Sequence, residues 1–390
     1  MKVLRELYSR GLFLTVDEVL NHTGSGPVSY DGDLAARRLD AWRDVATAGD
    51  LSLFCEFLHG RGIDYDSAAR RLGEQPVLSE PLPSWLEVLI GTIEIAMCRY
   101  RSLSLSEVCE HARPFGYITE VLVLSAESLR DASLSKVALE RFLPKARSDL
   151  RDHLCDRIEA ILVAPLYQSF KSWVQSSSSN GQTTFKERSA ANGEDVSHLE
   201  FLSEFFERGL EALWSERPVL ALLLGKVFEQ WMISTRELIE RFNFSQQSLQ
   251  DFVGGSPRCL VVEGVRCGLS DLHHAGRSVC ILSIQGGARL VYKPRSVSAE
   301  AAWERFVEWI DERLPSTTLK PMQVLDCKDY GWCEFVQGPS AVNREQAQAF
   351  FHRAGVLLGL LHLMAATDMH EENLIACGEY PVLVDLEMIL

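Results

Sequence analysis

A chain of 390 residues with 46% hydrophobic and 24% charged side chains can bury a sizeable core, in two domains or one large one. Its net charge of −15, from 54 acidic and 39 basic residues, argues against a nucleic-acid or anionic-membrane partner, because neutralising phosphates requires a basic surface. No apolar run approaches the roughly 20 residues of a membrane span, and charges interrupt the N-terminal segment where a signal peptide would be apolar. We therefore expect a cytoplasmic protein.

The ten cysteines are scattered along the chain, with no CxxC motif and no Cys-His pair. Reduced core thiols are therefore expected, and neither a disulfide framework nor a zinc site. The acidic excess would attract basic peptides or metal ions, although solubility explains it equally well.

Residues 1–250 show helical periodicity and predict a mainly helical region. Two stripes of apolar side chains are expected to be core. They consist of Trp85, Leu86, Leu89, Ile90, Ile93 and Met97, and of Phe201, Phe205, Leu210, Leu213 and Trp214. Residues 176–195 are polar and predict a mobile loop, and a loop of this length can also serve as a lid over a substrate.

The sequence changes character after Gly254, where short β-rich runs alternate with glycines and polar turns. The runs CLVVEGV, SVCILSIQG and ARLVYKP predict two or three antiparallel strands that end at Lys293-Pro294. The next segment, SAEAAWERFVEWIDERL, predicts a helix with one apolar face and with Ser298 as its cap.

The last part of the chain predicts a hairpin, a helix and a second hairpin. MQVLDCKDYGWCEFV turns near 329–331, REQAQAFFHRAGVLLGLLHLMAAT forms a long buried helix, and NLIAC and PVLVDLE are strands around residues 378–380. The expected class is α+β, with a large helical region at 1–250 followed by a strand-rich lobe at 251–390.

Several polar residues lie at the strand ends and in the loops that connect these elements. Lys293 closes a strand whose apolar neighbours would bury it, so an inward lysine there needs an anionic partner. Asp368 and Asn373 form a DxxxxN motif just after a helix, and Asp385 follows at the end of the last hairpin. A phosphotransferase needs this arrangement, in which one carboxylate approaches the attacking hydroxyl while the asparagine and the second carboxylate hold Mg²⁺.

Each of these residues also has an ordinary structural explanation. Asp368 could be a loop carboxylate after a helix, His370 a packed loop histidine and Asp385 a turn former. Those explanations do not account for their joint placement after a strand lysine and a long helix.

The segments LVYKPRS, GWCEFV, ATDMHEENLIA and PVLVDLE together resemble the dehydratase domain of the class II lanthipeptide synthetases, the enzymes often called LanM. RRLDAWRDVATAGDLSLFCEFLHGRGIDYDSAARRLG is similar to the opening of that domain, so the resemblance covers most of the chain. It implies a lipid-kinase-like core elaborated with helices, akin to protein kinases. Such enzymes use ATP and Mg²⁺ to phosphorylate serines and threonines of a ribosomal precursor peptide, then eliminate the phosphate to leave dehydroamino acids.

The resemblance assigns a role to each matching residue in the last 25 positions. Asp368 with His370 would orient or deprotonate the peptide hydroxyl, and Asn373 and Asp385 would bind the metal. Glu387 occupies the position where protein kinases carry the glycine of their DFG motif, and we place it with the cofactor-binding residues.

Upstream, the resemblance assigns cofactor binding to Lys293, which would contact the nucleotide phosphates. A kinase-like lysine requires a glutamate partner on the following helix. Glu300, Glu304 and Glu308 lie four residues apart on one stripe, and we favour Glu304, although an exposed acidic face explains all three equally well.

The segment GLSDLHHAGRSV matches the family's DxH element through Asp271 and His273, followed by Arg277. By resemblance these residues face the transferred phosphate and serve the elimination half of the reaction, because a histidine and an aspartate can supply the base that removes the α-proton. Without the resemblance, a solvent-exposed turn would be the preferred interpretation of DLHH. His274 and His362 are expected to be structural.

The chain also departs from the family pattern. Its relatives are far longer, and neither the residues that follow the DLE segment nor the zinc ligands of the cyclase domain are found here. We therefore expect a truncated or split synthetase, whose final apolar hairpin would expose hydrophobic surface unless the missing part covers it.

Three functions remain open from the sequence. The first is an ATP- and Mg²⁺-dependent dehydratase acting on a precursor peptide, and the second is a non-catalytic module that binds such a peptide. The third is a small-molecule kinase of the aminoglycoside or choline type, which shares DxxxxN but lacks the long helical region and the DxH element.

Overall fold

The computed structural model describes residues 2–21, 28–76, 81–101, 115–179, 195–254, 259–270, 276–314, 318–338 and 343–387. The chain divides into two compact units, each assembled from two segments. The first unit comprises residues 1–129 and 155–229, and the second comprises residues 130–154 and 230–390. The predicted boundary near residue 250 falls inside the second unit.

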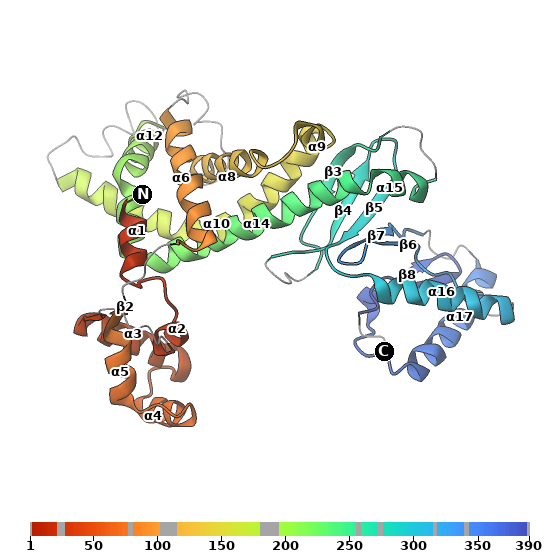
Figure 1. Cartoon of the computed structure of the whole chain (residues 1–390), viewed down its shortest axis with the longest axis horizontal. Coiled ribbons are helices and arrows are strands. Elements are labelled where there is room, and N and C mark those ends of the chain that lie inside the picture. The colour runs from red at the N-terminus through yellow and green to blue at the C-terminus, as the bar shows by residue number, and fades with distance from the viewer. Residues whose placement is uncertain are drawn as a thin grey trace. The chain divides into compact units, whose positions relative to one another are not determined.

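The first part of the chain is almost entirely helical (Figure 1). Its elements are α1 (Lys2–Ser9), α2 (Val16–Leu20), β1 (Val28–Tyr30), α3 (Gly32–Thr47), α4 (Leu51–Gly60), α5 (Tyr65–Gly73), β2 (Glu74–Pro76), α6 (Ser84–Arg101), α8 (Gly116–Asp131), α9 (Lys136–Glu140), α10 (Pro144–Ser179), α12 (Asp195–Glu204), the π-helix η1 (Phe205–Gly209), α13 (Leu210–Glu216), α14 (Pro218–Phe244) and α15 (Gln246–Phe252). Within the described residues, no helix is long and apolar enough to cross a membrane.

The two predicted helical stripes are core, as expected. On α6 all members except the half-buried Met97 are buried, and the five on α12, η1 and α13 are buried as well. The predicted polar loop begins later than expected, because α10 continues through Ser179, and residues 180–194 lie outside the described part of the chain.

The second unit contains a five-stranded antiparallel sheet (Figure 1). Its strands are β3 (Val262–Arg266), β4 (Cys280–Ile284), β5 (Arg289–Lys293), β6 (Val324–Asp326) and β7 (Gly331–Glu334), in the order β3-β4-β5-β7-β6. Three strands at the predicted positions and the predicted hairpin of β6 and β7 are therefore confirmed. Helices with antiparallel sheets are what an α+β class requires.

The sheet has two different faces because side chains alternate along each strand. Tyr292 of β5 and Trp332 of β7 are register partners, and with Phe242 of α14 they form an aromatic cluster on one face. Val291 and Cys333 point to the other face, where they pack with Val382. Lys293 follows Tyr292 and therefore belongs to this second face.

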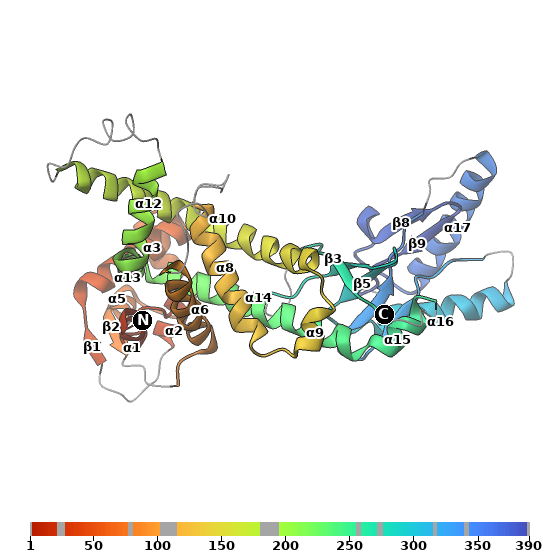
Figure 2. The ribbon, with the colours of Figure 1, turned by 90° about the horizontal axis from the view of Figure 1, so that it is seen from above.

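The elements that follow cover the second face. They are α16 (Ser298–Arg313), α17 (Arg344–Leu363), the 3₁₀ turn η3 (Glu371–Asn373), β8 (Leu374–Cys377) and β9 (Tyr380–Leu383). Figure 2 shows α17 beside the β8–β9 hairpin, and Leu357 packs with Leu383 in a cluster that also contains Trp303 and Val307 of α16.

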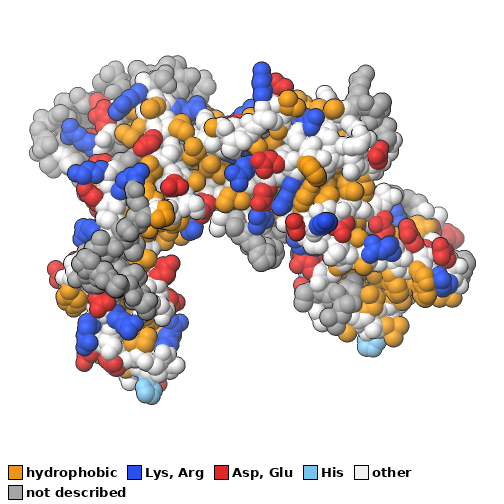
Figure 3. Space-filling model, in the orientation of Figure 1, with side chains coloured by type: hydrophobic (Ala, Val, Ile, Leu, Met, Phe, Trp, Pro, Cys, Tyr) orange, Lys and Arg blue, Asp and Glu red, His pale blue; other side chains and the backbone are white. Residues whose placement is uncertain are grey.

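Three expectations about these elements are wrong in part. Ser298 does not cap α16 but is its first residue, and its amide donates to the hydroxyl of Ser296. The final hairpin is partly covered, because Val382 and Leu383 of β9 are buried, although Ala376 of β8 is exposed. Instead α17, predicted to be buried, leaves apolar side chains open to solvent, and apolar surface is visible around α16 and α17 in Figure 3. The exposed ones on α17 are Phe351, Leu358 and Leu363.

Candidate functional site

Lys293 lies at the end of β5 with only 6% of its side chain exposed. Its Nζ atom is 2.9 Å from Oε1 of Glu300 and donates to the carbonyl oxygen of Val384 at 2.6 Å. A buried ammonium group requires such partners, since an unpaired buried charge costs several kcal/mol. The lysine therefore joins the sheet to α16 and to the residue that precedes Asp385.

Glu300, and not Glu304, is the ion-pair partner of this lysine, so the prediction of Glu304 is corrected. Glu300 stands in the first turn of α16 and its side chain is 1% exposed. Glu304 lies one turn further along, where burial and the neighbouring Glu308 raise its pKa. The difference follows from where α16 begins, because Val297 packs against Gly331 and brings the first turn of the helix onto the end of β5.

Arg295 completes this cluster and was not identified from the sequence. Its Nη2 atom is 2.8 Å from both Glu300 Oε1 and Asp385 Oδ1, and its Nε atom pairs with Glu387. The alternation of side chains could have pointed to it, because residues two apart on a strand and its extension face the same side. One guanidinium thus joins three predicted or candidate site carboxylates.

The charges of this cluster stabilise one another. Burial raises the pKa of Glu300, but Lys293 and Arg295 together outweigh that effect, and the pKa is lowered overall. Burial lowers the pKa of Arg295, whereas hydrogen bonding to Glu300 and the carboxylates of Asp385 and Glu387 raise it, and the net direction is upward. Glu300 and Arg295 therefore both stay charged near neutral pH.

The DxxxxN loop forms a second bonded group. Asp368 is exposed and has a left-handed backbone with φ 57°, a conformation that aspartate tolerates better than most residues. The Asn373 side-chain amide donates to the carbonyl oxygen of Asp368 at 2.8 Å and lies 3.5 Å from Nε2 of His370. The Asn373 carbonyl accepts from the amide of Val384 at 3.0 Å, which connects the loop to the strand end beside Asp385.

The structure does not bring Arg277 to this cluster. Its guanidinium binds both carboxylate oxygens of Glu237 on α14, at 2.8 and 2.6 Å, and this contact raises its pKa. Arg277 lines a small cavity with Tyr292, whose side chain points to the face of the sheet opposite Lys293. Asp271, His273 and His274 lie outside the described residues.

For the predicted metal ligands, Asn373 and Asp385, we ask whether their donor atoms suit Mg²⁺. Among the described residues, no three His, Cys, Asp or Glu side chains lie close enough to hold a metal ion. The amide nitrogen of Asn373 is used within the loop, so its oxygen would face a cation, and Asp385 would add a carboxylate. An amide and a carboxylate fit Mg²⁺, which usually takes one or two protein carboxylates together with phosphates and water.

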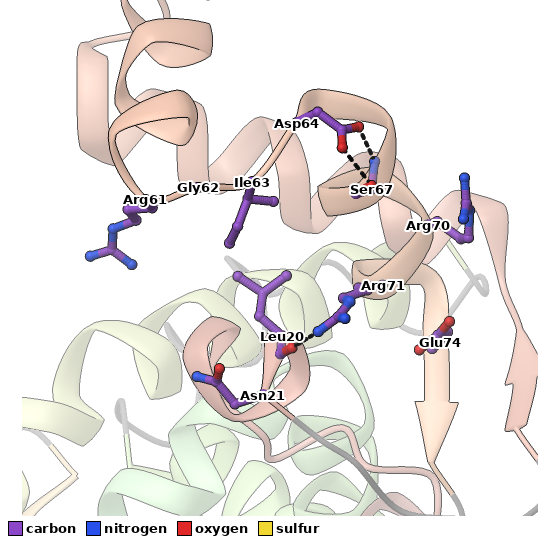
Figure 4. Close-up of a pocket in the computed structure, with 10 residues that line it drawn as sticks. All are labelled: Leu20, Asn21, Arg61, Gly62, Ile63, Asp64, Ser67, Arg70, Arg71 and Glu74. Carbon is purple, nitrogen blue, oxygen red and sulfur yellow. Dashed lines mark hydrogen bonds between the residues drawn. The ribbon is translucent and has the colours of Figure 1, made fainter.

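A polar pocket of about 570 Å³ lies in the first unit and shares no residue with this cluster (Figure 4). Arg71 points back to the carbonyl of Leu20, and Asp64 caps α5 through Ser67. These side chains serve the local fold, so we place the candidate site at Lys293 and not in this pocket.

A comparison with protein families matches the part of the chain that contains the candidate site. A family model described as "Domain of unknown function (DUF4135)" matches residues 218–390, which include every residue of the cluster. This domain occurs in LanM-type proteins, and the predicted resemblance to the class II lanthipeptide synthetases is confirmed.

One curated relative can be named. The chain is 34% identical over 125 residues to the lacticin 481/lactococcin biosynthesis protein LcnDR2 of Lactococcus lactis subsp. lactis. The match covers 30% of this chain and 13% of that protein. The chain thus spans a small part of its relative's length.

Proposed function

We propose that the second unit is a kinase-like lobe that transfers a phosphoryl group from ATP, with Mg²⁺, to serine and threonine hydroxyls of a ribosomal lanthipeptide precursor. This transfer is the first half of dehydration. The similarity to a lacticin 481/lactococcin biosynthesis protein supports a role in lanthipeptide modification.

The observation that carries the proposal is the buried Lys293–Glu300 pair, which contacts Val384 beside Asp385. Structural ion pairs between a strand and a helix are common, but this one lies beside the second carboxylate of a DxxxxN arrangement, because Arg295 connects Glu300 to Asp385. Those are the parts that a phosphotransferase must hold together, because its catalysis is mostly positioning and charge stabilisation.

The predicted site residues have different tasks in this reaction. Lys293 would bind nucleotide phosphate oxygens, and Glu300 fixes its direction. Asn373 and Asp385 would hold Mg²⁺, which when bound neutralises charge on the phosphates. Asp368, assisted by His370, would accept the proton of the peptide hydroxyl as its oxygen bonds to the γ-phosphorus and the bond to the ADP oxygen breaks.

The second half of dehydration is elimination of the phosphate. A base removes the α-proton, the Cβ–O bond breaks, phosphate leaves and a Cα=Cβ double bond forms. The family resemblance assigns this step to Asp271 and His273, and Arg277 is expected to take part only if it exchanges Glu237 for the phosphate.

Co-expression with the precursor peptide tests the proposal by mass spectrometry of the peptide. Phosphorylated peptide supports the first half, and loss of water supports both halves. We expect Lys293→Ala and Asp385→Ala to lower the yield of modified peptide about 100-fold or more, since each removes a charge that stabilises the transferred group. Lys320→Ala, a change at an exposed lysine of the same unit, should leave the yield unchanged.

An unmodified peptide in the presence of folded wild-type protein, ATP and Mg²⁺ would sink the proposal. Far-UV circular dichroism of each variant separates a loss of chemistry from a loss of fold. Transfer to a small aminoglycoside or to choline, with no effect on peptides, would favour a small-molecule kinase instead.

A further inference from the structure

Two cysteine side chains face each other at the edge of the sheet in the second unit. Cys267 follows β3, and Cys280 is the first residue of β4. In the antiparallel register Arg266 pairs with Ile281, so Cys267 and Cys280 occupy the next pair of positions. Their Sγ atoms are 3.4 Å apart, which is within contact distance.

This geometry is close to that of a disulfide. Opposed residues of an antiparallel pair have Cα atoms about 4.5 to 5.5 Å apart, and disulfides span about 4.4 to 6.8 Å. A small rotation of the two side chains is therefore enough to close the bond, and no movement of the strands is needed. Both cysteines are free thiols here.

The two thiols differ in their surroundings, and the difference assigns them different chemical roles. Cys280 is buried and its S–H group donates to the sulfur of Cys267. That hydrogen bond and burial raise the pKa of Cys280. Cys267 is half-buried and is therefore the more accessible of the two thiols to a reagent in solution.

The surroundings favour oxidation of this pair over binding of a ligand. The cavity beside the sulfurs is also lined by His153 and Arg277 and leaves about 20 Å³, room for roughly one water molecule. No group of three metal-binding side chains is found among the described residues, so the thiols are not part of such a cluster. A reagent must therefore reach Cys267 from solvent.

We propose that Cys267 and Cys280 are a redox modification site, which forms a reversible intramolecular disulfide by exchange with a low-molecular-weight disulfide such as oxidised glutathione. The thiolate of Cys267 attacks one sulfur of the reagent, forms a mixed disulfide and releases one thiolate. Cys280 then loses its proton to solvent, and its sulfur attacks Cys267 and expels the second thiolate. Two protein thiols are oxidised and one reagent disulfide is reduced to two thiols.

The bond would tie together the two ends of residues 268–279. That segment carries Asp271, His273 and Arg277 in the sequence, so the modification acts on the element to which the elimination half of the proposed reaction is assigned. The disulfide itself does not depend on the proposed function, because it follows from the two sulfurs alone.

Peptide mapping of the full chain tests the proposal. The reduced protein is incubated with oxidised glutathione, remaining thiols are blocked with N-ethylmaleimide, and digests are analysed by mass spectrometry. We expect one bridged peptide pair containing Cys267 and Cys280, with loss of both thiols together, and full recovery of both after dithiothreitol.

Two variants separate the roles of the sulfurs. Cys280→Ser should stop at a stable glutathione adduct on Cys267, and Cys267→Ser should leave Cys280 unmodified because that thiol is buried. Cys259→Ser, a change at an exposed cysteine of the same unit, should leave the bridge unchanged. Absence of a bridged peptide from oxidised wild-type protein, or a bridge from Cys267 to any other cysteine, overturns the proposal.

Discussion

Arg295 holds three carboxylates of the candidate site together through one side chain. It contacts Glu300, Asp385 and Glu387, which come from a helix and from the segment after the last strand. Lysine could not replace it, because a single ammonium group lacks the planar fork that binds several carboxylates in fixed directions. Arg295 also pairs with Asp385, so this carboxylate would have to exchange one positive partner for another to hold the proposed Mg²⁺.

Replacing Arg295 by glutamine should therefore destabilise the protein. We expect the free energy of unfolding to fall by about 2 kcal/mol, because hydrogen bonds to a largely buried carboxylate are lost. Denaturation in urea measures the change. The matched control is Arg313→Gln in the same segment, whose arginine is 51% exposed and should contribute no more than about 0.5 kcal/mol. Equal effects of the two changes would contradict the role given to Arg295.

The members of the candidate site could be proposed from the sequence, but their partners could not. Lys293, Asp368, Asn373 and Asp385 could be selected because their spacing is a local property of the chain. The choice between Glu300 and Glu304 depended on the residue at which α16 begins, which no helical pattern determines. The contact between Arg277 and Glu237 joins positions 40 residues apart, and only tertiary packing could reveal it.

At the scale of elements, the start of α16 depends on a close approach at Gly331. This glycine is the register partner of Lys293, and a Cβ atom there would overlap the side chain of Val297, which is fully buried. Val297 immediately precedes α16, so the absence of a side chain at Gly331 allows the helix to begin against the strand. The ion pair of Lys293 and Glu300 thus depends on a glycine that lies directly opposite Lys293 in the pairing of β5 with β7.

Gly331→Ala should destabilise the protein by about 1 to 3 kcal/mol, as expected for overpacking in a core. Thermal unfolding followed by circular dichroism provides the measurement. Gly355→Ala on α17 is the control, because nothing lies within 4 Å of its added Cβ and alanine favours a helix by roughly 0.5 to 1 kcal/mol. A Gly331→Ala variant as stable as the wild type would show that α16 can shift without cost.

Hairpins and helices were predicted well because turn residues and apolar periodicity are local signals. The burial of α17 was predicted poorly, because its sequence is apolar on more than one side. Only Leu357 of this helix is buried, and it packs with Trp303, Val307 and Leu383. The hydrophobicity of a helix shows how much apolar surface it could bury, but it does not show which of its side chains the rest of the chain covers.

At the scale of the whole molecule, two compact units share two long helices. Helices α10 and α14 each contribute residues to both units. In the second unit they are joined to each other through Trp231 of α14, whose indole N–H donates to the carbonyl of Leu150 on α10 at 2.9 Å. The acidic excess is a property of the complete chain, whose isoelectric point is about 5.2.

We expect acid to cause association before it causes unfolding. Near pH 5.2 the net charge vanishes, and molecules without net repulsion associate and precipitate. The fold should survive there, because the pKa of Glu300 lies below its ordinary value of 4.5. A carboxyl group with a lowered pKa contributes its full stability above the pKa of the unfolded chain, and loses it as the pH falls through the folded value.

Other carboxyl groups favour the same result. Burial raises the pKa of Glu304 and of Glu334, and such groups bind protons more readily in the folded state. Their contribution to the free energy of unfolding increases as the pH falls from neutrality toward 5.

Turbidity should therefore rise near pH 5.2 while tryptophan fluorescence stays native, and unfolding should begin only below about pH 4.5. In Glu300→Gln the stability should be lower at neutral pH and vary less between pH 5 and pH 3. Unfolding that coincides with the turbidity, or a variant with the pH dependence of the wild type, would show that the Lys293–Glu300 pair does not control acid stability.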